Sequence, residues 1–110
     1  MVFRICRTTE GTFRFELSER KFGLLFIGLN VDSESTAQEQ ILWLRQYASL
    51  EGIYQRFQPP EGGFGFTVHA AGGTLVGRSP IFPEQRDREI AIEYMRLRTR
   101  TAAPPIIVEC

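Results

Sequence analysis

The 110-residue chain contains two stretches that align with each other, without a gap, at an offset of 51 residues. Residues 11–17 (GTFRFEL) align with residues 62–68 (GGFGFTV), and the apolar positions on both sides keep the same register. Self-similarity at a fixed offset indicates a repeat architecture, here residues 1–50 and 51–101 followed by a tail. A segment of about 50 residues buries too little surface to be stable alone, so we expect the two copies to share one core in a single domain.

Each copy is predicted to begin with three strands. Apolar and charged residues alternate through most of these segments, which is the pattern of a half-buried strand. The tail ends in three β-branched residues and predicts one last short strand within residues 104–110. The predicted strands of the two copies are residues 3–7, 13–17, 24–29, 54–58, 64–68 and 74–78.

A helix follows the third strand of each copy. Asp32 or Ser33 is a suitable N-cap for a helix that runs to about Ser49, and Pro83 begins one that runs to about Arg98. The order βββα, βββα, β with short turns predicts an α+β fold. Its strands pair antiparallel and its helices lie on one face.

Both copies resemble the YegP-like family, small bacterial proteins of unknown function that contain one or two such copies. The first copy reads F-x-I-x-x-x-x-x-G-x-F-R-F-x-L from Phe3 to Leu17, and the second carries the related pattern from Tyr54 to Ser79. The resemblance implies one antiparallel sheet built from both copies. It also implies that strands after the helices are exchanged, so that residues 106–108 pair with the first copy. It brings no catalytic residue.

Composition excludes several kinds of site. Thirteen basic and thirteen acidic residues balance, which argues against a nucleic-acid coat or a polybasic membrane arm. One histidine and two cysteines cannot build a zinc site, and no phosphate-binding loop or nucleophile–base set is present. We therefore predict no metal, no cofactor and no catalytic residues.

The termini carry the prediction of compartment. The first residues lack a secretory signal and the longest apolar run, residues 24–29, is too short to span a bilayer, so we expect a cytoplasmic protein without a membrane partner. In the cytoplasm Cys6 and Cys110 are expected as free thiols, with a bridge between them as the alternative.

Residues 63–66 (GFGF) match the core of an RNA-recognition strand, in which aromatic rings stack on bases. The basic residue that should lead the match is Gly62, and the strand order differs from that of the RNA-binding fold. We therefore predict that Phe64 and Phe66 pack in the core, as Phe13 and Phe15 do in the first copy. A platform for single-stranded nucleic acid that uses these rings and nearby arginines is the alternative.

Six exposed candidates remain for contact with a partner or an anion. They are Arg96, Arg98, Arg100, Trp43, Tyr94 and Arg14. The three arginines at the end of the second helix either stabilise its dipole or bind an anion or partner; acidic residues of the first helix could then pair with them between molecules. Trp43 and Tyr94 either pack on the neighbouring helix or mark a docking site, and Arg14 is expected in a cross-strand ion pair.

The sequence thus predicts a non-enzymatic binding module whose partner is another macromolecule or a second copy of the chain. A single-stranded nucleic-acid binder and an enzyme with an unrecognised pocket are the two alternatives.

Overall fold

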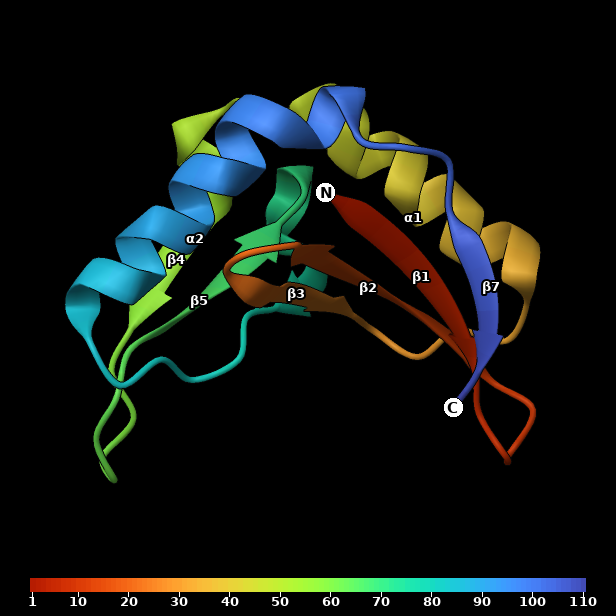
Figure 1. The fold of residues 1–110 in the computed structure, drawn as a ribbon, viewed down its shortest axis with the longest axis horizontal. Coiled ribbons are helices and arrows are strands. Elements are labelled where there is room, and N and C mark those ends of the chain that lie inside the picture. Colours follow the sequence, from red (N-terminus) through yellow and green to blue (C-terminus); the bar gives the residue numbers. More distant parts are fainter.

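A computed structural model describes all residues, 1–110, as one sheet with two helices on one of its faces (Figure 1). The strands are β1 (Val2–Arg7), β2 (Phe13–Glu19), β3 (Gly23–Gly28), β4 (Tyr54–Phe57), β5 (Gly65–His69), β6 (Leu75–Arg78) and β7 (Ile106–Glu109). The helices are α1 (Glu34–Tyr47) and α2 (Gln85–Arg98). Seen as in Figure 1, the molecule has the shape of an arch, with the two helices along its outer side.

The strand order is β4-β5-β6-β3-β2-β1-β7, which joins both halves of the chain in one seven-stranded sheet. The α+β fold with a shared sheet and two helices is confirmed. The tail strand β7 lies beside β1 of the first half, as the resemblance implied, but it runs parallel to β1 while every other pair is antiparallel. The sheet is therefore mixed, because the chain returns from α2 to β7 by a crossover instead of a hairpin turn.

The core lies between the sheet and the helices. Along β2, Phe15 and Leu17 are fully buried, and along β5 so are Phe66 and Val68, as the alternation predicted. Helix residues cover them; the apolar residues buried on the helices are Ala37, Ile41, Leu44, Ala91, Ile92 and Met95. Phe13 and Phe64 are only half-buried, since both lie at the end of their row, so the prediction that they are core residues was too strong.

Two glycines face each other at the centre of the sheet, where β3 meets β6. Gly28 pairs with Gly77. A Cβ on Gly28 would overlap the ring of Phe15, and a Cβ on Gly77 would lie 2.7 Å from Cζ of Phe26. The missing side chains let these two rings lie directly against the backbone, as close packing of the core requires.

Each helix reaches the end of the other. Arg45 of α1 donates hydrogen bonds to the carbonyls of Ala102 (2.6 Å) and Ala103 (2.8 Å), which follow α2. Arg96 of α2, which lies 51 residues after Arg45, donates to the carbonyl of Ser49, which follows α1 (3.4 Å). These bonds give partners to carbonyl groups in the segments that follow the helices. They also make the two helix ends depend on one another.

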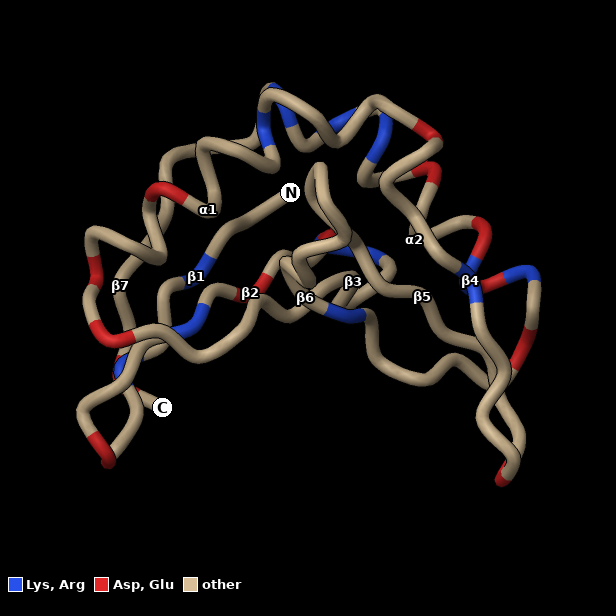
Figure 2. The backbone as a smooth tube through the Cα atoms, turned by 180° about the vertical axis from the view of Figure 1, so that it is seen from behind, with Lys and Arg blue, Asp and Glu red and all other residues tan.

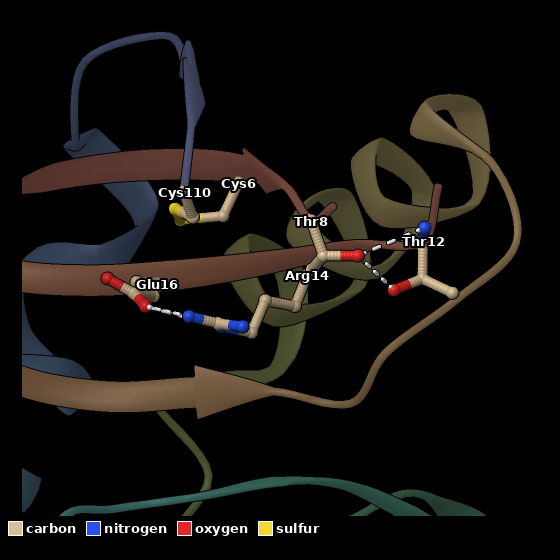
Figure 3. The surroundings of a disulfide bond; sticks show 6 residues. All are labelled: Cys6, Thr8, Thr12, Arg14, Glu16 and Cys110. Carbon is tan, nitrogen blue, oxygen red and sulfur yellow. Dashed lines mark hydrogen bonds and ion pairs between the residues drawn. A yellow bond between two sulfur atoms is a disulfide. The ribbon is translucent and has the colours of Figure 1, made fainter. Parts of the chain in front are cut away.

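Cys6 and Cys110 form a disulfide, so the expectation of free thiols is wrong (Figure 3). The parallel register places Cys6 opposite Val108, two residues before Cys110, and the two cysteine Cα atoms lie 5.4 Å apart. That separation lies within the range that a disulfide spans. Free thiols were expected because a cytoplasmic location was predicted. The disulfide forms because β7 brings the C-terminal Cys110 beside β1, which carries Cys6.

Candidate functional site

Most of the arginine cluster at the end of α2 is neutralised within the molecule. Arg96 lies 3.6 Å from a carboxylate oxygen of Glu51, and Arg98 lies 3.5 Å from one of Glu19. Arg100 is exposed and forms no ion pair. The cluster is therefore not the free basic patch that its spacing suggested.

Two carboxylates near this cluster are held in the ionised form. Glu19 is buried and accepts the Lys21 backbone N–H at 2.7 Å, a hydrogen bond that lowers the pKa of its carboxyl. Glu89 accepts two hydrogen bonds from Arg56 at 3.0 Å, which lower the pKa of Glu89 in the same way. Both groups secure α2 to the sheet.

Arg14 pairs with Glu16 on its own strand, at 3.2 Å, so the predicted cross-strand partner is wrong (Figure 3). Residues two apart on a strand point to the same face, which brings the two side chains together. Arg4 of β1 lies opposite Glu16 but donates to the hydroxyl of Ser18 (3.1 Å) instead.

Tyr94 lies on the flank of α2, where another ring covers one side of it and a small hollow of about 170 Å³ remains on the flank. The ring of Phe22, from the turn between β2 and β3, lies 5.8 Å from both the Tyr94 ring and the Phe82 ring. The guanidinium of Arg98 lies over the ring of Tyr94, 5.2 Å from its centre. Tyr94 is half-buried, and its contacts are with this turn and with its own helix.

Trp43 lies on the matching flank of α1, in a place that is open. Its ring contacts Tyr47 of the same helix, with the ring centres 5.1 Å apart, and it is half-buried. Gly73, which lies 51 residues after Phe22 in the sequence, brings no side chain to this flank. Two hollows of about 250 and 380 Å³ remain on either side of Trp43, and both are also lined by Ala70.

One polar atom in the Trp43 hollow has no partner. The amide oxygen Oε1 of Gln40 is buried and accepts no hydrogen bond, and Gln40 lines the smaller hollow together with Leu75. A buried acceptor without a donor costs about 1–3 kcal/mol. We call the two hollows, which share Trp43 and Ala70, the Trp43 groove.

A third hollow, of about 450 Å³, lies on the helix-free face of the sheet. Its strand residues alternate with the buried Phe15 and Phe26, so their side chains point away from the helices. Figure 2 shows basic positions in blue across this part of the arch. The lining residues are Arg14, Glu16, Ile27, Gly28, Leu29, Asn30 and Arg78.

No metal-binding cluster accompanies these hollows. No group of three or more His, Cys, Asp and Glu side chains could hold a metal ion. The single histidine, His69, lies 2.8 Å from the Thr67 hydroxyl and 3.3 Å from the Gly73 carbonyl, so both ring nitrogens have neighbours within the protein. Neither helix is long and apolar enough to cross a membrane.

The fold is that of the YegP-like proteins, which the sequence resembled. The "protein of unknown function yegP" from E. coli superposes with a TM-score of 0.87 at 20% identity, over 98% of this chain and 92% of that one. The UPF0339 protein SO3888 from Shewanella oneidensis gives a TM-score of 0.88 at 15% identity, over 98% and 91%. No family model and no curated protein matches the chain. The likeness establishes the fold.

Proposed function

We propose that the protein is a non-enzymatic binding module, and that the Trp43 groove takes an apolar segment of a partner protein that also carries basic residues. The observation that carries the proposal is the unfilled, mainly apolar space around Trp43. An apolar side chain of a partner replaces the missing contacts beside the tryptophan.

Charge selects the partner. Glu39 lines the groove and forms no ion pair. Its carboxylate gives the rim a negative charge that attracts a basic segment. A second copy of the chain is a poorer partner, because Arg96 and Arg98 already pair within their own molecule.

The only tryptophan of the chain is in the groove, so its fluorescence reports occupancy directly. We expect a peptide that carries leucines among lysines, without tryptophan, to shift the emission of Trp43 in a saturable titration. Ala70→Phe fills the groove and should abolish the shift, and the same peptide with glutamate in place of lysine should bind at least tenfold more weakly. Leu97→Ala, on the exposed side of α2, is the matched control and should bind like the original protein.

Equal binding by the Ala70→Phe variant, or equal binding of the acidic peptide, would contradict the proposal. A pull-down from the native cell with the original protein and with Ala70→Phe extends the test, because a true partner is retained by the first and lost from the second.

We propose the cytoplasm as the compartment, and the redox state of the two cysteines tests it. The Cys6–Cys110 bond argues against it, since disulfides persist chiefly in oxidising compartments. Alkylation of intact cells with a thiol-specific mass tag distinguishes the cytoplasm from an oxidising compartment. Two tags on the chain support the cytoplasm, and none until reductant is added contradicts it.

We also propose that residues 1–50 and 51–101 are copies of one unit. The common order of three strands and a helix and the reciprocal bonds of Arg45 and Arg96 support this. A fragment of residues 1–50 alone should be unfolded by circular dichroism, because α1 then loses its contacts with the end of α2.

A further inference from the structure

The hollow on the helix-free face, lined by Arg14, Arg78 and Asn30, is a separate site that the proposed function does not use. We propose that it binds the phosphate group of a small organic phosphate monoester, with the organic part resting on Ile27 and Leu29. We call it the sheet-face hollow.

The shape of the hollow comes from a detour of the chain after β3. Strand β3 pairs with β2 as far as Ile27 opposite Glu16, and the two segments meet again only where Phe13 bridges Val31. Between these points Leu29 donates its backbone N–H to Val76 of β6 instead of to β2. The detour opens about 450 Å³ of space, the size of a small-molecule site.

Hydrogen-bond donors converge on this space. Arg78 is exposed, and its side chain forms neither an ion pair nor a hydrogen bond with any other residue. The backbone N–H of Asn30 has no protein acceptor, and Asn30 also lines the space. Arg14 holds Glu16 through Nε and one terminal nitrogen, which leaves the other terminal nitrogen free. The single carboxylate of the hollow is thus already neutralised.

This donor set matches a phosphate. A guanidinium binds phosphate oxygens in bidentate geometry, and a free backbone N–H adds a third donor. The floor of the hollow is apolar, since Ile27 lies between Glu16 and Arg78 in the register of the sheet and Leu29 is 39% exposed. An inorganic ion would leave that floor uncovered, so an organic phosphate should bind better than phosphate alone.

The equivalent position in the second half shows what a closed version looks like. Gly65 occupies the place of Arg14, and a Cβ there would lie 2.7 Å from Cζ of Phe57 and 3.1 Å from Cδ1 of Ile81. These two apolar side chains cover the second half where the first half is open. Ile81 aligns with Asn30 in the repeat, so Asn30→Ile is a filling substitution that the fold already uses elsewhere.

The test is a titration of the isotope-labelled protein with phenyl phosphate, followed through its backbone amide NMR signals at constant ionic strength. We expect saturable shifts centred on residues 28–30 and 77–78, with affinity at least fivefold above that for inorganic phosphate and above that for phenol. Arg78→Ala and Asn30→Ile should each weaken binding at least tenfold. Arg100→Ala, which removes an unpaired arginine elsewhere, should change it less than twofold.

Three results would overturn the proposal: no saturable shift, shifts spread equally over Arg86 and Arg100, or undiminished binding by both hollow variants. An octathymidylate that competes at a lower concentration than phenyl phosphate would instead assign the face to single-stranded nucleic acid and would also overturn it. Unchanged amide spectra of the variants away from the hollow, before ligand is added, show that they have folded.

Discussion

The two halves of the molecule share their order of elements and differ in which places are filled. On the flank of α2 the ring of Phe22 packs beside Tyr94 and a hollow of only about 170 Å³ remains, whereas on the flank of α1 the corresponding turn ends in Gly73 and hollows of about 250 and 380 Å³ lie beside Trp43. On the helix-free face the relation is reversed between halves, since Phe57 and Ile81 cover Gly65 while the hollow at Arg14 is open. Because a side chain occupies the equivalent position in the other half, the fold does not require the open position to stay empty.

The sheet edges differ too. β1 is covered by β7 and joined to it by the disulfide, while β4 is an uncovered edge.

Just after β6, the hydroxyl of Ser79 accepts the backbone N–H of Phe66 at 2.9 Å, and Gly28, the aligned residue of the first half, has no hydroxyl to do the same. Positions that a side chain fills contribute packing contacts, whereas open positions leave apolar surface and polar groups available to a ligand.

Removing a buried ring from the core should lower the free energy of unfolding equally in both halves, and this is the largest effect that we expect. Phe15→Ala and Phe66→Ala each remove a fully buried ring and should each lower the free energy of unfolding by about 3–5 kcal/mol in urea titrations. Phe64→Ala should cost less than half as much, because its ring is half-buried. Equal losses of unfolding free energy for Phe64→Ala and Phe66→Ala would contradict this, because they would show that the ring of Phe64 is as buried as that of Phe66.

The disulfide should separate the two edges. Cys110→Ser releases a bond between residues 104 positions apart and should lower the free energy of unfolding by about 2–4 kcal/mol. Reductant should have the same effect on the original protein and none on the variant, measured by urea unfolding. An original protein that is indifferent to reductant would mean that β7 is held by its strand pairing alone.

The helix flanks should respond in opposite ways. Phe22→Ala empties the filled flank and should cost about 1–2 kcal/mol, because a half-buried ring between two other rings is lost. Ala70→Phe adds a ring to the open flank and should change stability by no more than about 0.5 kcal/mol, since the hollow receives it. A large loss with Ala70→Phe, measured by thermal unfolding, would show that the Trp43 groove is not free space.

The smallest effect concerns acid. The pKa values of Glu19 and Glu89 are lowered in the folded protein, so their contribution to stability is complete above the ordinary value of 4.5 and is lost as the pH falls below it. Glu19→Gln should flatten the fall in the free energy of unfolding between about pH 5 and pH 3, where a lowered carboxyl pKa acts. Glu61→Gln, in an exposed turn, is the control and should leave the slope unchanged.

Residue type and spacing identified only some of the residues that line the two candidate sites. Trp43, Tyr94 and Arg14 were singled out by type and spacing, and of these Trp43 lines the Trp43 groove and Arg14 the sheet-face hollow. Gln40, Asn30 and Arg78 were missed, because an amide or an arginine on a strand has no distinctive pattern. The signal that could have found them is the offset itself, which sets Gly73 against Phe22, Gly65 against Arg14 and Ile81 against Asn30.

Strand and helix identities depended on local alternation, spacing and caps, so residues 1–110 alone determined seven strands, two helices and their order. Ser33 does cap α1, with its hydroxyl accepting the Thr36 N–H at 3.1 Å. Only the tertiary structure decided that β7 runs parallel to β1, that Cys6 meets Cys110, and which equivalent places are open. Those outcomes depend on contacts between residues far apart in the sequence, whose geometry no local pattern encodes.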